Sequence, residues 1–284
     1  MPHYGYVTDF RGRVAVVTGA GGGIGLGLAR RFAAEGMKVV LADIDHGALR
    51  EAVGELESTG AEALGVPCDV AKADEVEALA KEALDAFGGI NVVFNNAGVS
   101  MAGPLWEMSE RDWDWVLGVN LRGVLTGIRV FTPILLEQEW GHLVNTASVA
   151  GLITGVLGAY SVTKHAVVAA SEALQVQLAM QGSSVGVSVL CPGWVQTRIV
   201  ESERNRPAEY GPAPELNEFE KQMQEVIAGL VAAGQTPDEV ADKVVDAIRE
   251  RRFYIVTHPE MLPAVEHRAQ TILRGEQPAA PGFV

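Results

Sequence analysis

The stretch VAVVTGAGGGIG, residues 14–25, decides the predicted fold. Its first four residues are apolar, as in a strand that is buried on both faces, and a helical pattern begins at about residue 24. The glycines between them permit a tight turn and a close approach of the backbone to a ligand. Free N–H groups at the start of the following helix attract an anion. The stretch therefore predicts a strand, a turn and a helix that together bind a phosphate group, in the frame TGxxxGxG rather than GxGxxG.

The same alternation continues along the first 250 residues. Strands are predicted at Val14–Val17, Lys38–Ala42, Ala63–Val66, Val92–Phe94, His142–Asn145, Gly186–Leu190 and Phe253–Val256. Helical patterns lie near residues 24–35, 46–58, 72–87, 109–138, 159–181, 218–233, 236–250 and 259–274. Repeated strand and helix with right-handed crossovers predict an α/β fold: a single doubly wound Rossmann-type domain, with a parallel β-sheet flanked by helices on both faces.

Composition excludes several classes of protein. The chain has 284 residues, 48% of them hydrophobic and 20% charged, so it can bury a core and is not globally disordered. Its net charge of −14 disfavours a nucleic-acid partner. No apolar run reaches the roughly 18 residues that a membrane span needs, and residues 1–13 do not resemble a secretory signal. Cys68 and Cys191 have no metal-ligand spacing, so we expect no metal, no disulfide and a cytoplasmic location.

An acidic residue follows the second predicted strand. Asp43 lies 18 residues after Gly25, where a carboxylate can accept hydrogen bonds from the ribose hydroxyls of an adenine dinucleotide. It would also repel a 2′-phosphate, and no Arg or Lys lies in the glycine turn or directly after Asp43. These residues favour NAD over NADP. The alternative role of Asp43, a helix cap, suits Asp45 better.

Three polar residues are candidates for proton chemistry, although a Tyr and a Lys at this spacing, taken alone, are more often ordinary surface residues. Tyr160 and Lys164 are four residues apart in a helical stretch, so they share one face. A cation beside a phenol lowers its pKa, and such a tyrosine can take a proton from an alcohol or give one to a carbonyl oxygen. Ser148 follows the fifth strand region at the carboxyl edge of the sheet, where ligands bind. Its hydroxyl is predicted to hold a substrate oxygen.

The motifs occur in a characteristic order: TGxxxGxG at residues 18–25, NNAG at 95–98, then Asn120, Ser148, YxxxK at 160–164, and PG at 192–193 with Thr197. Over residues 10–256 this order resembles the short-chain dehydrogenase/reductase family. The resemblance implies a cofactor site built from Gly19, Gly23, Ile24, Gly25, Asp43, Ile44, Asp69, Val70, Asn96, Ala97, Gly98, Tyr160, Lys164, Pro192, Gly193, Val195 and Thr197.

The resemblance also implies catalytic roles. Tyr160 matches the acid/base, and Ser148 matches the partner of the substrate oxygen. Lys164 matches the residue that binds the nicotinamide ribose and lowers the tyrosine pKa. Asn120 matches the residue that holds a water of the proton relay. We place an N-terminal arm at residues 1–12, the catalytic domain at 13–256, and a C-terminal extension at 257–284. Within the domain, residues 193–235 are expected to form a substrate-binding loop and helix.

The expected substrate pocket is apolar: Leu152, Ile153, Val156, Leu157, Trp194, Ile199 and Val200. This favours reversible hydride transfer between a hydrophobic or aromatic secondary alcohol and its ketone. Residues 204–211 and 253–256 are similar to a subgroup that includes benzylic-alcohol dehydrogenases of lignin-fragment breakdown. Arg198, Arg204 and Arg206 could instead meet a carboxylate or phosphate, although charged loop residues are usually solvated.

Two alternatives remain open for the function. One is a 3-oxoacyl thioester reductase that uses NADPH, which Asp43 disfavours. The more remote one is a non-catalytic dinucleotide-sensing protein on the same fold. The long fourth and fifth helical patterns resemble those that build family tetramers, so we expect a homotetramer, with a dimer as the next choice.

Overall fold

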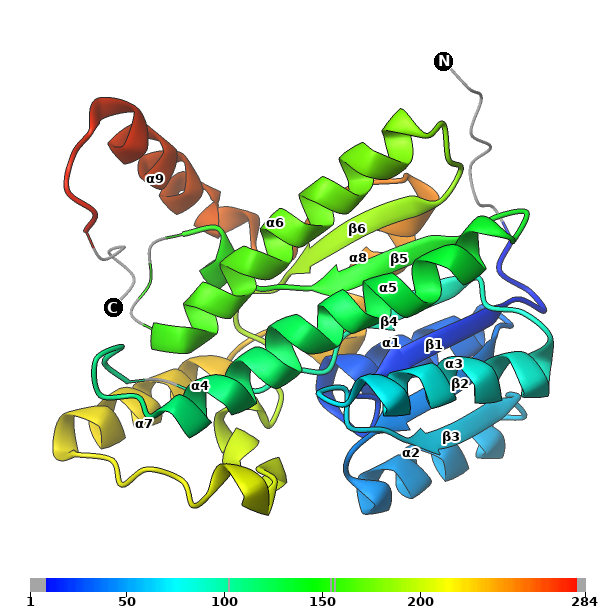
Figure 1. The fold of residues 1–284 in the computed structure, drawn as a ribbon, viewed down its shortest axis with the longest axis horizontal. Helices are drawn as coiled ribbons and strands as arrows, with labels where there is room; N and C mark the ends of the chain where they lie inside the picture. The colour runs from blue at the N-terminus through cyan, green and yellow to red at the C-terminus, as the bar shows by residue number, and fades with distance from the viewer. Residues whose placement is uncertain (1–8, 102, 154, 156, 280–284) are drawn as a thin grey trace.

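A seven-stranded parallel sheet forms the centre of the protein (Figure 1). The computed structural model describes residues 9–279 except 102, 154 and 156. Among the described residues, the strand order is β3-β2-β1-β4-β5-β6-β7. The strands are β1 (Val14–Thr18), β2 (Lys38–Asp43), β3 (Ala63–Pro67), β4 (Val92–Asn95), β5 (His142–Thr146), β6 (Gly186–Cys191) and β7 (Tyr254–Val256). The predicted Rossmann-type fold is confirmed, and each predicted strand lies within about two residues of its observed bounds.

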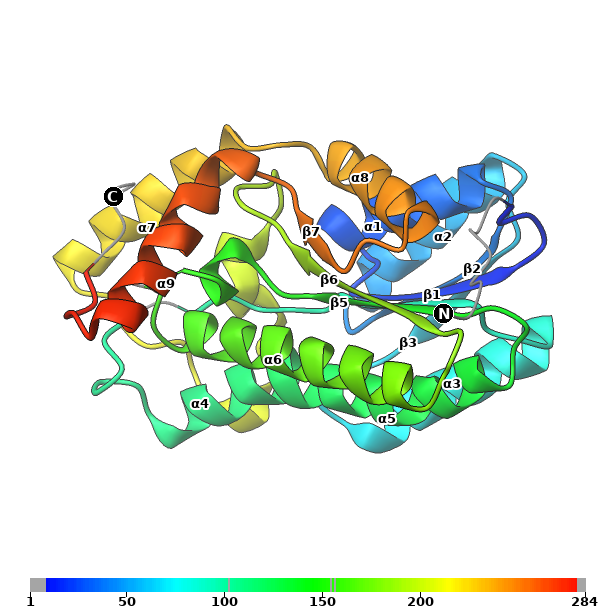
Figure 2. The ribbon, with the colours of Figure 1, turned by 90° about the horizontal axis from the view of Figure 1, so that it is seen from above.

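Helices cover both faces of the sheet (Figure 2). One face carries α1 (Gly23–Ala34), α2 (His46–Ser58) and α8 (Pro237–Arg249), and the other carries α3 (Ala73–Phe87), α5 (Gly123–Leu136) and α6 (Gly158–Met180). Strand β1 shows why both faces are apolar. Ala15 and Val17 belong to the core on the α1 side, whereas Val14 and Val16 belong to the core on the α3 side. Successive side chains of a strand point to opposite faces, so a two-sided core requires a continuous apolar run.

Two segments differ from the sequence-based expectation. The predicted helix 109–138 forms α4 (Glu110–Leu117), a π-helical turn at Gly118–Arg122 that contains Asn120, and then α5. The loop predicted at 193–217 contains two short 3₁₀ helices, at Ile199–Asn205 and Ala208–Tyr210, before α7 (Glu218–Ala232). π turns are frequent at functional sites, so the position of Asn120 in one is a first structural indication of a site.

Packing extends past both expected ends of the catalytic domain. Phe10 is fully buried and stacks edge-on against Phe32 at 5.4 Å, so the core begins before residue 13. Thr257 and His258, in the expected extension, are buried and accept hydrogen bonds from the backbone N–H of Gly193. Only α9 (Leu262–Arg274) projects away from the sheet (Figures 1 and 2).

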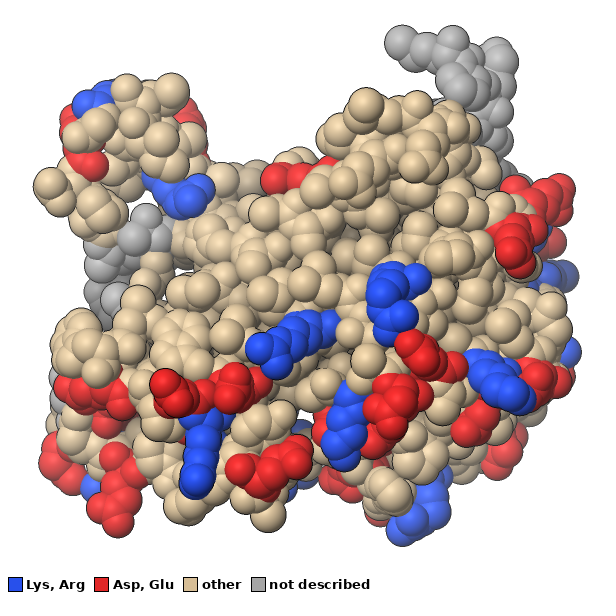
Figure 3. All heavy atoms as spheres, viewed as in Figure 1, with Lys and Arg blue, Asp and Glu red and all other residues tan. Residues whose placement is uncertain are grey.

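The surface is unevenly charged. Acidic side chains gather over α3, α4 and α7 in Figure 3, whereas the surface over α6 is almost free of charge. By length and composition alone, one described helical stretch, Glu110–Leu136, is long and apolar enough to cross a membrane. This stretch includes α4, the π turn and α5, and its buried side contains Trp115, Asn120 and Phe131.

Candidate active site

A cavity of about 390 Å³ lies at the carboxyl edge of the sheet. The strands are all parallel, but β2 and β3 are added on one side of β1 and β4 to β7 on the other, so the strand order reverses between β1 and β4. Ligands of doubly wound sheets bind at such a switch point. Most of the predicted site residues line the cavity: Gly19, Gly23, Ile24, Asp43, Ile44, Asp69, Val70, Asn96, Ala97, Gly98, Ser148, Ile153, Leu157, Tyr160, Lys164, Pro192, Gly193, Trp194, Val195, Thr197, Ile199 and Val200.

The turn after β1 requires its glycines. Gly19 and Gly23 have φ angles of +66° and +53°, a backbone region that disfavours other residues. A Cβ atom on Gly25 would lie 2.0 Å from the carbonyl oxygen of Gly19. Gly25 does not line the cavity but allows α1 to pack closely against the turn. The first turn of α1 therefore opens directly onto the cavity, as an anion site needs.

Asp43 holds the glycine turn in place from the tip of β2. Its carboxylate accepts hydrogen bonds from the backbone N–H of Gly21 at 2.8 Å and of Asp45 at 2.9 Å. Asp45 accepts from Gly47 and Ala48 and caps α2, so the cap is Asp45, as predicted. Asp43 remains half-buried at the cavity wall. In the described lining, the basic side chains are Lys164, Arg198 and Arg204, and none is adjacent to Asp43 in sequence.

A polar network joins the strands beneath the cavity. The hydroxyl of Thr18 accepts hydrogen bonds from the backbone N–H groups of Asn96 and Ala97, at 2.9 and 3.1 Å. The amide of Asn96 donates to the carbonyl of Thr18 and accepts from the hydroxyl of Thr146. This network ties β1, β4 and β5 together and aligns the lining backbone on either side of the switch point.

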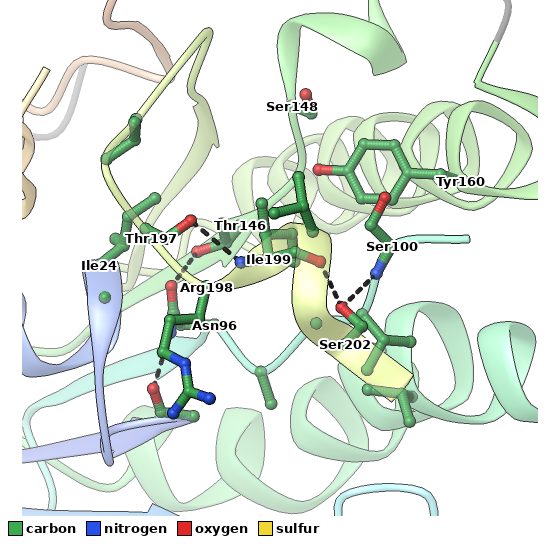
Figure 4. A pocket seen from close by; sticks show the side chains of 18 of the residues that line it. Ile24, Asn96, Ser100, Thr146, Ser148, Tyr160, Thr197, Arg198, Ile199 and Ser202 are labelled. Carbon is green, nitrogen blue, oxygen red and sulfur yellow. Dashed lines mark hydrogen bonds between the residues drawn. The ribbon is translucent and has the colours of Figure 1, made fainter. Parts of the chain in front are cut away.

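Ser148, Tyr160 and Lys164 come together at one end of the cavity. Figure 4 shows Ser148 and the hydroxyl of Tyr160 as neighbours on the same side. The Ser148 hydroxyl accepts from the N–H of Ala150 and donates to the carbonyl of Pro192 at 3.3 Å. The Lys164 ammonium donates to the carbonyl of Thr146 at 2.9 Å and lies 5.5 Å from the centre of the Tyr160 ring.

Burial shifts the pKa values of Tyr160 and Lys164. Desolvation raises the pKa of Tyr160, and its hydrogen bond with Ser148 acts in the opposite direction. Burial also lowers the pKa of Lys164 to about 8. The resemblance implied a lowered tyrosine pKa, but in this structure the pKa of Tyr160 is raised overall. Burial disfavours the charged phenolate more than the local partners favour it. Additional positive charge at the cavity would shift the balance toward the phenolate.

Asn120 lies behind the cavity rather than in its wall. It is fully buried, accepts a hydrogen bond from the N–H of Val99 and donates to the carbonyl of Val99 and to the hydroxyl of Thr163. A Cβ atom built on Gly98 would lie 3.4 Å from both the Asn120 carbonyl oxygen and the Lys164 ammonium. Asn120 thus fixes the backbone beside Lys164, while its side-chain groups are occupied by protein partners.

One predicted wall residue lies elsewhere, one is not described, and the loop arginines have protein partners. Leu152 does not line the cavity, because it packs against the cluster around Val167 and Val168. Val156 lies outside the described residues. Arg198 pairs with Glu201 and Arg204 with backbone carbonyls, whereas Arg206 is buried.

The helix expected within the substrate-binding residues 193–235 forms one wall of the pocket, but none of its residues was among the predicted site residues. Helix α7 lines it with Met223, Val226, Ile227, Leu230 and Val231. Their spacing of three and four residues forms a single stripe on the helix. This apolar period was visible at 218–233, but it did not show which part of the protein the stripe would face.

The fold and this site define a Rossmann-type α/β oxidoreductase. A family profile described as short chain dehydrogenase matches residues 13–208. The chain therefore belongs to the short-chain dehydrogenase/reductase family.

Several known proteins are similar to this chain. The 1-deoxy-11-beta-hydroxypentalenate dehydrogenase of Streptomyces arenae is 43% identical over 257 residues, which are 87% of this chain and 83% of that protein. The C alpha-dehydrogenase of a Sphingobium strain is 33% identical over 276 residues, 95% of this chain and 88% of that protein. A short chain dehydrogenase/reductase of Burkholderia phymatum, solved in complex with NAD, is 45% identical with a TM-score of 0.95, and the match covers 98% of this chain and 100% of that one.

Proposed function

We propose that the protein is an NAD-dependent dehydrogenase that interconverts hydrophobic secondary alcohols and their ketones. One observation carries the proposal: the paired hydroxyls of Ser148 and Tyr160 share a cavity with the glycine turn and Asp43. The turn and Asp43 offer backbone N–H groups and a carboxylate at one end. The two hydroxyls and Lys164 offer a site for a reacting oxygen at the other end.

The residues present fit NAD. A Cβ atom at Gly19 would lie 2.8 Å from Ala97 Cα and one at Gly23 2.9 Å from Thr197 Cγ2, so this part of the site has room only for backbone. Such a turn suits a pyrophosphate, and the Asp43 carboxylate suits the hydroxyls of an adenosine ribose. The 2′-phosphate of NADP would be repelled by that carboxylate, and no Arg or Lys next to Asp43 in the sequence would compensate for the repulsion. When bound there, NAD would supply the hydride chemistry between the carbinol carbon of the alcohol and the carbonyl carbon of the ketone.

The chain itself supplies positioning and proton transfer. In oxidation, the Tyr160 phenolate removes the hydroxyl proton, and the Ser148 hydroxyl donates a hydrogen bond to the same oxygen. In reduction, the Tyr160 phenol protonates the oxygen. The Lys164 ammonium stabilises the phenolate, and we propose that Asn120 supports the proton relay by holding the backbone beside Lys164. Cys191, nearby but fully buried, takes no part, since burial raises the pKa of its thiol to about 12.

The pocket wall supports a hydrophobic substrate. Apart from Ser148 and Tyr160, its substrate side carries Ile153, Leu157, Trp194 and the stripe of α7. Val226 in that stripe is 53% exposed, so it has little other packing. Apolar surface of this kind stabilises a bulky aryl or aliphatic alcohol better than a sugar. Two relatives are also named as dehydrogenases, one of 1-deoxy-11-beta-hydroxypentalenate and one a C alpha-dehydrogenase.

A substrate panel tests the proposal. Purified protein is mixed with NAD or NADP and with 1-phenylethanol, 2-octanol, a cyclic terpenoid alcohol or a hydrophilic polyol, and NADH or NADPH formation is followed by absorbance. We expect turnover of the apolar secondary alcohols with NAD. Turnover of only a 3-oxoacyl thioester with NADPH would support the alternative reductase. If the protein binds NADH but oxidises none of these alcohols, the proposed substrate class is refuted.

We also propose a homotetramer built through α5 and α6. Large apolar side chains are exposed on these helices: Leu125, Leu136, Val162, Val176 and Met180. The surface over α6 is also almost without charge in Figure 3. A single species of about 30 kDa in sedimentation would contradict this proposal. The two free, buried cysteines suit the proposed cytoplasmic location.

A further inference from the structure

A buried ion pair joins the substrate-binding loop to α4. The guanidinium of Arg206 donates to the carboxylate of Asp112 at 2.6 Å, across 94 residues of sequence. The side chains are only 4% and 9% exposed. In contrast, each of the other ion pairs found among the described residues includes at least one side chain that is 30% or more exposed, and this holds for the pair of Arg206 with Glu203 as well.

The loop itself uses most of the remaining donors of Arg206. Its Nε donates to the carbonyl of Gly211 at 3.0 Å, and its Nη2 also donates to the carbonyl of Tyr210 at 2.8 Å. The guanidinium lies 4.9 Å from the centre of the Trp115 ring, which is buried on α4. One side chain therefore connects two turns of the loop with two positions on the helix.

Asp112 is held in place independently of Arg206. It forms a capping box with Ser109 at the start of α4, where it accepts from the Ser109 backbone N–H and hydroxyl. Burial raises the pKa of Asp112, but the hydrogen bonds from Ser109 and Arg206 together outweigh burial and lower the pKa overall, so the carboxylate stays charged opposite the guanidinium. A buried ion pair stabilises a fold weakly because of desolvation, but removal of one partner leaves a buried charge. Such a pair is suited to fixing one arrangement of two segments.

Both joined segments form the wall of the pocket. Ile199, Val200 and Tyr210 of the loop line the cavity, as does Trp115 of α4. The loop is held on its other side by Ser202, whose hydroxyl accepts from the N–H of Ser100, as Figure 4 shows. Movement of the loop away from α4 would therefore change the shape of the pocket, although neither Arg206 nor Asp112 lines it.

We propose that Arg206 and Asp112 form a clamp that positions the substrate-binding loop, residues 198–211, on α4 before the substrate arrives. They are positioning residues, because they act through the pocket wall and do not touch the reacting atoms. The clamp keeps the alcohol-binding side of the cavity ordered and so lowers the KM for the alcohol. Its effect on catalysis rests on the proposed function, whereas its effect on loop order does not.

Limited proteolysis tests the order of the loop without any substrate. Trypsin cleaves after Arg198 and Arg204 only when the loop opens, and the cleavage rate follows the open fraction. Asp112→Asn keeps the shape of the side chain but removes its charge, and we expect cleavage about tenfold faster. Arg206→Gln should give a similar increase, and the double variant no further one, because the two residues act as a unit. Arg129→Gln removes the exposed ion pair with Glu77 and serves as the matched control.

Kinetics with an alcohol from the substrate panel test the positioning role. For Asp112→Asn and Arg206→Gln we expect the KM of the alcohol to rise about tenfold, with kcat and the NADH Kd within about threefold of the parent. Arg206→Lys keeps the charge but loses the planar fork, and should restore only part of the loss.

Distinct results would overturn the clamp. One is tryptic cleavage of Asp112→Asn at the parent rate, and another is additive effects of the two substitutions. Asp112→Asn is the decisive variant if Arg206→Gln does not fold, because its shape and its hydrogen bonds with Ser109 are largely retained. A loss of kcat with unchanged KM would also contradict positioning. If the parent oxidises no alcohol, the proposed function fails, while the proteolysis still decides whether the clamp exists.

Discussion

The proposed preference for NAD should depend on the charge of Asp43. We consider Asp43→Asn, which keeps the size of the side chain and one oxygen that can accept from Gly21 or Asp45. The substitution removes the charge that faces the adenosine end of the cavity. It should weaken NADH binding and strengthen NADPH binding. The variant Asp45→Asn is a matched control, because it removes a charge two residues away and Asn still caps a helix.

The magnitude follows from two contributions. A hydrogen bond from a ribose hydroxyl to a carboxylate exceeds a neutral one by about 1 kcal/mol. Two unit charges about 4 Å apart repel by about 1 kcal/mol in water and about 4 kcal/mol at a protein surface. Because Asp43 is half-buried, we take about 2 kcal/mol for its repulsion of a 2′-phosphate. The sum of about 3 kcal/mol predicts a change of about 100-fold in the NADPH/NADH affinity ratio.

Fluorescence titration of each variant with NADH and with NADPH measures this ratio. Titrations at low and high salt separate the two contributions, because salt screens the repulsion more than the hydrogen bond. The reasoning is refuted if Asp43→Asn changes the ratio less than about threefold, or no more than Asp45→Asn does.

Three further predictions concern titrating groups. Tyr160→Phe should lower kcat by about 10²- to 10⁴-fold with little change in NADH affinity by titration; activity within tenfold of the parent would exclude Tyr160 as the acid/base. Because burial raises the Tyr160 pKa, the phenolate fraction and with it the rate of alcohol oxidation should increase with pH above neutral, whereas ketone reduction, which uses the phenol, should stay nearly constant below the Tyr160 pKa; the gain in oxidation should level off above about pH 8, where Lys164 loses its charge, and an oxidation rate independent of pH would contradict this. Burial lowers the pKa of His142 to about 3 from 6.5, so between these values the unfolded chain binds a proton that the folded chain does not. The free energy of unfolding should therefore fall by about 1.4 kcal/mol for each unit of acidification in that range, and urea titrations of His142→Gln should show a shallower dependence.

The sequence predicted the sheet and most of the cavity wall because both depend on local patterns. Apolar runs define strands, and a residue just after a parallel strand lies at the carboxyl edge whichever helices cover the sheet. Asp43 ends β2, and Asn96 and Ser148 follow β4 and β5, so their common location at the carboxyl edge follows from the parallel strands alone. The glycine turn was equally readable, since Gly19 and Gly23 adopt positive φ angles that other residues avoid.

The orientation of side chains within irregular segments was not readable. Ile153 lines the cavity, whereas its neighbour Leu152 packs behind it. A short 3₁₀ turn at Val149–Gly151 sets this difference, and no periodicity marks it. In the same way, the apolar stripe of α7 was visible as a helix face, but only the folded chain directs it onto the cavity.

The family, the fold and the residues that line the carboxyl edge could therefore be predicted from the sequence, because they follow from short-range patterns. The direction in which the pKa of Tyr160 shifts and the ion-pair partner of Arg206 depend instead on the tertiary structure. Burial of Tyr160 depends on everything packed around it, and it outweighs its local partners. Arg206 looked like a solvated loop residue until the fold brought Asp112 to it from 94 residues away. Desolvation and long-range ion pairs are properties of the assembled chain, so no local pattern records them.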